Sequence, residues 1–232
     1  MSVGNNITTS QSLPKASKGY KGLAMEGFIA KWYAKNRQKD MREFNSLARR
    51  VAETVAAGSA ILEIAPGPGY LSIELAKLGN YQITGLDISK SFVEMAQKNA
   101  QEAGVAIDFR LGNAARIPFD DETFDFIVCM AAFKNFSEPV RALIEMNRVL
   151  KPNGRALISD LRRDVSQEEI KKLVANMGLN WLDSLLTRWI FKYSLIKRAY
   201  TQAEIREFVS KTKFSNCDIQ ETLVGLEISL EK

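Results

Sequence analysis

The sequence predicts a single α/β domain built on a mostly parallel β-sheet. Three observations support this class: apolar strand-like runs alternate with helical patterns, the chain has 232 residues, and 46% of them are hydrophobic while 25% are charged. Alternating strands and helices are typical of a parallel sheet with right-handed crossovers, and the length and composition suit one globular domain. We expect residues 1–18 to form a disordered polar lead and residues 19–232 to form the domain.

Seven strands are predicted from apolar runs bounded by turn residues. They cover residues 60–65, 81–87, 105–109, 124–129, 154–160, 216–223 and 226–231. Helical patterns over residues 70–78, 91–103 and 138–150 separate the earlier strands, so these are expected to be parallel, and the last strand antiparallel. Three helix starts show a Ser or Thr followed three residues later by Glu, the pattern of a capping box. These pairs are Ser91/Glu94, Ser166/Glu169 and Thr201/Glu204.

Two segments lie outside the predicted sheet. Residues 19–57 read as an N-terminal helical cap that leads into the first strand. Residues 161–200 contain a series of apolar and aromatic side chains that includes Trp181, Trp189 and Phe191. A helix packed on the sheet would explain this series, and so would an apolar lid over a hydrophobic ligand; we interpret residues 161–200 as a helical lid insertion. Ligand specificity is expected in these added segments rather than in the sheet.

The first strand runs directly into a turn that contains two glycines. Its residues 60–65 are followed by Pro66-Gly67-Pro68-Gly69, and a helical pattern begins at once. Because Gly67 and Gly69 have no Cβ, the turn can be tight and a ligand can lie on its backbone. The helix that follows presents free N–H groups to the same place. Nucleotide-binding folds of several chemistries share such a turn, so the glycines alone do not identify the ligand.

Two carboxylates narrow the choice of ligand. Asp87 ends the second strand about 20 residues after Gly67, where an acid of a dinucleotide-binding fold contacts ribose hydroxyls. The third small residue of a nicotinamide fingerprint is replaced by Ser72, and Glu63 at the mouth of the turn would repel a pyrophosphate. S-adenosylmethionine carries a ribose and an α-ammonium group but no phosphate, and a carboxylate suits its ammonium.

Two later motifs strengthen this interpretation. They are Gly112-Asn113-Ala114 followed by the run from Ile117 to Cys129, and the run from Glu145 to Gly154 with the strand that follows it. With the glycine turn, they resemble class I S-adenosylmethionine-dependent methyltransferases of the small-molecule, ubiquinone/menaquinone-biosynthesis-like type 11 subgroup. The resemblance covers roughly residues 55–160. It implies a Rossmann-like, seven-stranded sheet with helices on both faces.

The resemblance also implies which residues bind the cofactor. They are Glu63, Ala65, Gly67, Gly69, Asp87, Ile88, Asn113, Ala114 and Met130. Two of them depart from the family pattern. The first glycine of the family's loop is Ala65 here, and the acid that usually contacts the adenine amino group is Asn113, whose amide oxygen can still accept a hydrogen bond. The implied partners are S-adenosylmethionine and a small-molecule acceptor.

The chain contains no histidine. Methyl transfer from a sulfonium is an in-line displacement, so the protein mainly aligns donor and acceptor and excludes water. Where the acceptor must lose a proton, only Asp, Glu, Lys, Tyr or Cys could take it. Lys134 and Tyr33 are the candidates for catalysis, with Asp160 and Tyr200 as weaker ones; a surface lysine at the cleft rim and a packing tyrosine are the alternatives. We expect the acceptor between residues 130–136, 20–33 and 181–200.

Charge leaves several further functions open. The formal net charge is +5, with basic clusters near the N-terminus and around residues 188–198. A solvated basic face is the simplest explanation, but nucleic acid, a membrane surface or an anionic substrate would also fit. No recognisable RNA module is present, and the two cysteines offer no metal motif. We find neither an apolar run long enough to span a membrane nor a signal-peptide pattern, and we expect a cytoplasmic protein. A quinone or lipid methyltransferase at a membrane surface, an RNA methyltransferase and a non-catalytic cofactor-binding module remain alternatives.

Overall fold

The computed structural model describes residues 19–21, 25–176, 185 and 195–232. Its helices are α1 (Gly27–Arg37), α2 (Met41–Thr54), α3 (Tyr70–Leu78), α4 (Lys90–Glu102), α5 (Pro139–Val149), α6 (Gln167–Asn176) and α8 (Gln202–Val209). Short 3₁₀ helices are η1 (Gln38–Asp40), η2 (Phe133–Asn135) and η4 (Ile196–Arg198). The strands are β1 (Ala60–Ile64), β2 (Gln82–Asp87), β3 (Asp108–Leu111), β4 (Phe124–Met130), β5 (Leu150–Leu161), β6 (Asn216–Glu221) and β7 (Gly225–Glu231).

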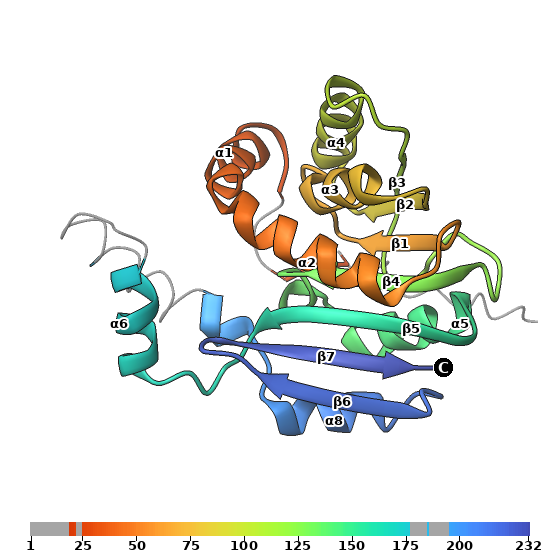
Figure 1. Cartoon of the computed structure of the whole chain (residues 1–232). Helices are drawn as coiled ribbons and strands as arrows, with labels where there is room; N and C mark the ends of the chain where they lie inside the picture. Colours follow the sequence, from red (N-terminus) through yellow and green to blue (C-terminus); the bar gives the residue numbers. More distant parts are fainter. Residues whose placement is uncertain (1–18, 22–24, 177–184, 186–194) are drawn as a thin grey trace, which may run out of the picture.

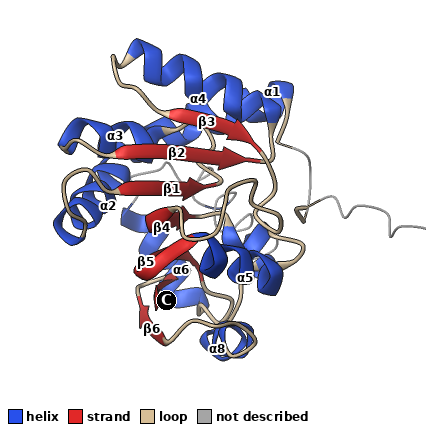
Figure 2. Ribbon diagram, turned by 90° about the vertical axis from the view of Figure 1, so that its right-hand side faces the viewer, coloured by secondary structure: helices blue, strands red, loops and turns tan. Residues whose placement is uncertain are grey.

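The strands form one sheet of seven in the order β3-β2-β1-β4-β5-β7-β6. Neighbouring strands from β3 to β5 are parallel, and β7 runs antiparallel to both β5 and β6. Figure 2 shows this order, from β3 at the top of the view to β6 near the bottom. The predicted Rossmann-like sheet, mostly parallel with an antiparallel last strand, is therefore confirmed.

Helices cover both faces of the sheet because its central strands are apolar on both sides. In β4, Ile127 and Cys129 pack in the cluster that contains side chains of α5 and α8. Phe126 and Val128, which alternate with them along the strand, point to the opposite face and pack with α2 and α3. Figure 1 shows α2 in front of the sheet and α5 behind it. A continuous apolar run is typical of such a doubly covered parallel strand.

Two strand starts differ from the prediction by more than one residue. The strand predicted at residues 105–109 begins at Asp108, because Val105 instead closes the end of α4. The N–H of Val105 donates to the carbonyl of Ala100, and Gly104 adopts a φ of +69°, which together form a Schellman ending. The strand predicted from residue 154 begins at Leu150, which pairs with Phe124 across a shift in register.

The capping-box prediction is confirmed at two helices and wrong at the third. The pairs Thr201/Glu204 and Ser166/Glu169 both form, at α8 and α6. At α4 the cap is Ser89, whose hydroxyl accepts from the N–H of Phe92 at 3.1 Å. Ser91 instead accepts from the N–H of Gly27, because α1 packs beside this end of α4.

The segment before β1 contains α1 and α2, and the segment after β5 contains α6 and η4. The predicted polar lead at residues 1–18 and the aromatic side chains Trp181, Trp189 and Phe191 of the predicted lid lie outside the described residues. Among the helices that the structure describes, none combines the length and the apolarity needed to cross a membrane.

Neighbouring residues of α5 should respond very differently to truncation. Leu143 is fully buried against the sheet, whereas Ile144 is 46% exposed. Leu143→Ala should lower the free energy of unfolding by about 2–5 kcal/mol through lost burial and a cavity, and Ile144→Ala by at most about 0.5 kcal/mol. Urea unfolding of both variants checks this, and similar losses in the two would contradict the described packing of α5.

Candidate functional site

The turn after β1 is held open by its backbone conformation. Gly67 and Gly69 have φ values of +55° and +79°, which favour glycine. A Cβ at Gly67 would meet nothing within 4 Å, so this side of the turn faces open space that a ligand can occupy. At Gly69 a Cβ would lie 3.0 Å from the Cβ of Ala96, so the second glycine also allows α3 and α4 to approach. Ala65 has a φ of +58°, which explains why a glycine is common at this position of the family's loop.

The carboxylate of Asp87 joins this turn to the start of α4. Its Oδ2 accepts from the N–H of Gly67 and its Oδ1 from the N–H of Ser89, each at 2.9 Å. The side chain is 5% exposed, and burial raises its pKa to about 6 despite these hydrogen bonds. The ribose contact of Asp87 stays a prediction from the sequence, and the structure shows that this carboxylate holds the backbone at the turn and at the start of α4.

Glu63 is a second buried carboxylate at the same edge of the sheet. It lies in β1, directly before the turn, and accepts a hydrogen bond from the hydroxyl of Ser72 in α3. Burial raises the pKa of Glu63 to about 7, with the charge of nearby Asp87 adding to the shift. A cationic group bound beside Glu63 would relieve this penalty. Ser72 and Ser89 could not be recognised from the sequence as partners of the two carboxylates, since their only signal is a serine near a helix start.

Ile88 and Asn113, two of the expected cofactor residues, lie together under the N-terminal segment. Gly19 contacts both, so closely that a Cβ there would lie 2.3 Å from the Cδ1 of Ile88 and 2.7 Å from the Nδ2 of Asn113. The Oδ1 of Asn113 accepts from the N–H of Ala115 at 2.9 Å and turns the chain after β3. Nothing in the sequence indicated that Gly19 would reach this place.

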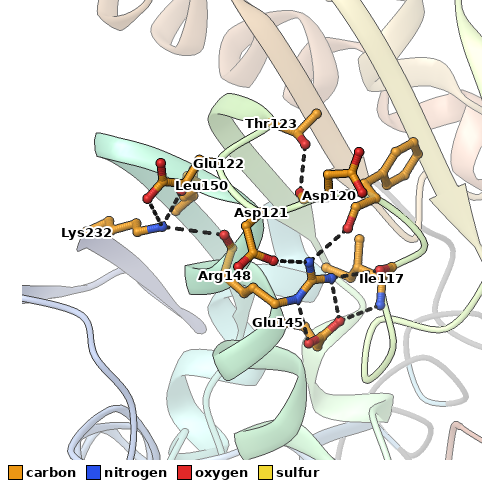
Figure 3. A network of polar contacts seen from close by, with 10 residues as sticks. Ile117, Asp120, Asp121, Glu122, Thr123, Glu145, Arg148, Leu150 and Lys232 are labelled. Atoms are coloured by element: carbon orange, nitrogen blue, oxygen red, sulfur yellow. Dashed lines mark hydrogen bonds and ion pairs between the residues drawn. The ribbon is translucent and has the colours of Figure 1, made fainter.

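A charged network anchors the connection between β3 and β4, which carries Asn113 and Ala114 (Figure 3). The guanidinium of Arg148 in α5 donates to both carboxylate oxygens of Glu145 and to Asp121. It also donates to the carbonyls of Ile117 and Phe119, at 2.9 and 2.8 Å. These neighbouring carboxylates raise the pKa of Arg148 further. The network fixes this connection to α5.

Lys134 is buried rather than at the cleft rim. Its ammonium is 2.7 Å from the Oδ1 of Asp160 and 2.5 Å from the carbonyl oxygen of Ala131. The other oxygen of Asp160 accepts from the Lys134 N–H at 2.7 Å. Both side chains are 6% exposed, so the alternative of a surface lysine at the cleft rim is wrong. The pair sets the conformation of the segment after β4, where Met130 is buried and Ala131 has a φ of +57°.

The three segments expected around the acceptor do meet in part. Lys21 donates from its backbone N–H to the carbonyl of Asn135 and from its ammonium to the hydroxyl of Tyr200. Tyr20 forms an isolated antiparallel β-bridge with Phe136, and the ring of Phe133 packs against that of Tyr200. Described parts of residues 20–33, 130–136 and 181–200 are thereby brought together.

Tyr33 lies elsewhere, on α1. Its ring packs edge-on against Phe92 of α4, with ring centroids 5.7 Å apart. This contact is the packing role that we considered as the alternative to catalysis.

The residues present fit S-adenosylmethionine. Gly67 offers open space beside its backbone, and Glu63 is a buried carboxylate whose raised pKa favours a cationic partner. Each oxygen of Asp87 accepts one backbone N–H and retains a lone pair for a hydroxyl. Adjacent parallel strands bring these groups to one edge of the sheet, where ligands of such folds bind.

The known proteins to which this chain is similar are methyltransferases. A family model described as a methyltransferase domain matches residues 62–158. The demethylmenaquinone methyltransferase of Deinococcus radiodurans is 30% identical over 159 residues, 66% of this chain and 66% of the relative. A ubiquinone biosynthesis O-methyltransferase of Xanthomonas euvesicatoria is 27% identical, over 75% of this chain and 73% of the relative. The structure of a putative S-adenosyl-L-methionine-dependent methyltransferase of Methanococcus maripaludis matches 97% of each chain, with a TM-score of 0.69 and 21% identity.

The fold, the site and the family match together define the class of the protein: the chain belongs to the class I S-adenosylmethionine-dependent methyltransferases. Within that class its domain is of type 11, a group of small-molecule methyltransferases. Relatives of this chain include enzymes named for quinone biosynthesis. The resemblance stated from the motifs is confirmed. The alignment spans about two thirds of the Deinococcus relative.

The unliganded protein is expected to lose stability as the pH rises. Burial raises the pKa of Glu63 from 4.5 to about 7 and that of Asp87 from 3.8 to about 6. A raised carboxyl pKa means that the folded state holds the proton more tightly. The stabilising contribution is therefore complete below the unfolded pKa and is lost as the pH rises through the folded value. Each carboxyl contributes on the order of 3 kcal/mol across this window.

Urea unfolding at about pH 3.5 and about pH 8 tests this expectation, because the unfolded and folded pKa values of both carboxyls, from 3.8 to about 7, lie between these two pH values. The double variant Glu63→Gln/Asp87→Asn is the comparison, since amides of the same shape do not titrate. The wild type should lose more stability between the two pH values than the variant does. The same pH dependence in both proteins would show that these carboxyls are not buried as described.

Proposed function

We propose that this protein transfers the methyl group of S-adenosylmethionine to a small-molecule acceptor. The observation that carries the proposal is the pair of buried carboxylates at one edge of the sheet, Glu63 and Asp87, on either side of the open turn at Gly67. The cofactor supplies an electrophilic methyl group, so the chain has to align two molecules and keep water out.

The roles proposed for the cofactor residues follow from their chemistry. Glu63 pairs with the α-ammonium group, and Asp87 accepts from ribose hydroxyls while it holds the turn. Ile88 and Asn113, with Ala114, contact the adenine. The backbone of Ala65, Gly67 and Gly69 lies along the cofactor, and Met130 lies beside the methyl group. The roles of the loop backbone and of Met130 extend the family pattern to the matching positions of this chain.

We further propose an aromatic, quinol-like acceptor. Two relatives carry names from quinone biosynthesis. The chain has no histidine, which suits an acceptor that ionises readily, as a ring hydroxyl does more easily than an alcohol. The segment after β4 contributes the aromatic side chains of Phe133 and Phe136, and Tyr200 packs beside them.

Lys134 then serves as a positioning residue. Its ammonium is bound to Asp160 and to the carbonyl of Ala131, so it shapes the segment beside the methyl group. Positioning and exclusion of water supply most of the rate in this proposal. For Tyr33, contact with the acceptor remains a prediction beside its observed packing on Phe92.

A cytoplasmic location also remains a prediction.

Analysis of the reaction products would distinguish two other functions from the proposed one. Transfer of radiolabelled methyl to RNA would favour an RNA methyltransferase, with binding that weakens steeply as salt rises. Binding of S-adenosylmethionine without formation of its demethylated product, with any quinol or catechol supplied, would favour a non-catalytic module.

Cofactor binding should depend on Asp87. Asp87→Ala should weaken the affinity for S-adenosylmethionine by roughly 1.5–3 kcal/mol, the range for a charge-assisted hydrogen bond. Asp218→Ala, at an exposed position of β6, should leave it unchanged. Calorimetry on both variants measures the effect, and thermal unfolding without ligand shows whether each is folded.

Thermal unfolding of the wild-type protein in the presence of candidate ligands identifies the cofactor. S-adenosylmethionine or its demethylated product should raise the unfolding temperature of the wild type, because each binds the folded state. Stabilisation by NADH but not by these two compounds would overturn the proposed function.

The role of Lys134 can be separated from proton transfer. Breaking a buried ion pair by removing one partner costs about 3–5 kcal/mol, whereas replacing both partners by apolar residues is often tolerated. We therefore expect Lys134→Met/Asp160→Leu to fold, to keep its cofactor affinity and to lose turnover by less than about tenfold. A loss of about 100-fold or more, the range of acid–base catalysis, would instead show that the ammonium acts on the acceptor.

A further inference from the structure

The outer face of α1 is unusually apolar for an exposed helix. Phe28 is 80% exposed and Trp32 is 59% exposed, while Ile29 beside them is also exposed. Positions 28 and 32 are four residues apart, so their side chains lie next to each other on one side of the helix. Exposed aromatic residues that gather on one face mark an interaction site more often than scattered ones do.

Basic side chains continue the same face. Lys31 and Lys35 are exposed, and at three and seven residues after Phe28 they flank the aromatic pair. No acidic residue occurs between Gly27 and Arg37. The acids that flank α1 in the sequence already have hydrogen-bond or ion-pair partners. Glu26 accepts from the N–H groups of Lys90 and Ser91, and Asp40 pairs with Arg37. The α1 outer face, defined as Phe28, Ile29, Lys31, Trp32 and Lys35, is therefore apolar and positive.

The inner side of α1 holds the helix beside the cofactor site. Ala30 and Ala34 are buried, and Tyr33 packs on Phe92 of α4. Just before α1, the carbonyl of Met25 accepts from the hydroxyl of Ser89, whose N–H binds Asp87. Figure 2 shows α1 on the side of the sheet to which the arrowheads of β2 and β3 point. The outer face is thus presented to solvent on the side of the molecule that carries the proposed site.

We infer that the α1 outer face docks on the surface of a bilayer that contains anionic phospholipids. Aromatic and aliphatic side chains at interfacial depth gain from burial in the headgroup region. Lysines on the same face gain from the negative surface potential and can extend their ammonium groups toward the phosphates. RNA would also attract the lysines and could stack on Phe28 and Trp32. Ile29, which has no stacking surface, favours the bilayer.

Vesicle sedimentation with the full-length chain tests this inference. The wild type should bind vesicles of phosphatidylcholine mixed with phosphatidylglycerol more tightly than vesicles of phosphatidylcholine alone, and added salt should weaken the binding. Lys31→Gln/Lys35→Gln should weaken it roughly 30-fold, from about 1 kcal/mol for each lysine. Phe28→Ser/Trp32→Ser should weaken it at least as much.

Matched variants control for general effects of charge and hydrophobicity. Lys98→Gln/Lys211→Gln removes two exposed lysines, one from α4 and one from the turn after α8, and changes the net charge equally. Ile144→Ser/Leu223→Ser removes two exposed apolar side chains elsewhere on the surface. Neither control should change vesicle binding by more than about twofold if the α1 outer face is the docking site.

Several results would overturn the inference. These are no binding of the wild type to anionic vesicles, equal loss in the control variants, or binding of this face to RNA but not to vesicles. Two further measurements could also overturn the inference. A lower unfolding temperature of Phe28→Ser/Trp32→Ser would show that the face packs within the protein, and a change in its mass in solution would show contact with a second copy. None of these outcomes bears on cofactor binding, so the proposed function is tested separately.

Discussion

The hydrogen bond from the Gly67 N–H to the Asp87 carboxylate joins the turn after β1 to the end of β2. A carboxylate that is buried at this depth needs donors, and the backbone of the turn and of Ser89 supplies them. One side chain therefore sets the distance between two strand ends and the position at which α4 begins. The turn that this carboxylate holds in place leaves open space beside Gly67. The cofactor side of the site depends on this constraint.

Charged groups hold the other walls of the site. Arg148 binds the connection that carries Asn113, and Lys134 binds Asp160 below the segment after β4. Buried ion pairs add little net stability, because desolvation offsets their attraction, but they accept only a narrow geometry. Both Ala65 and Ala131 adopt positive φ values at the ends of β1 and β4. Such strain, about 1–2 kcal/mol for a residue with a Cβ, is expected where surrounding contacts impose a functional conformation.

The N-terminal segment connects the site to the surface. Its inner contacts reach Ser89 and, through Gly19, the expected cofactor residues Ile88 and Asn113. On its outer side, the side chains of Phe28 and Trp32 are exposed to solvent. If a quinol-like acceptor and a bilayer surface are the two partners, the same segment faces both, and the acceptor can reach the site without crossing bulk water. The two partners rest on separate observations and on separate experiments.

Much of the fold and of the cofactor site could be predicted from the sequence because both depend on local patterns. Apolar runs, glycines in a turn and an acid at a strand end are properties of short segments, and parallel strands bring such ends to one edge. Local patterns could not show that Ser89 rather than Ser91 begins α4, since the choice depends on α1 packing beside it. They could not show that Lys134 points inward, because Asp160 comes from another strand. The chain by itself thus determined the class of protein and the edge of the sheet at which the candidate site lies. Only the tertiary structure decided which charges are buried together, since the attraction and desolvation of charged groups depend on neighbours distant in sequence.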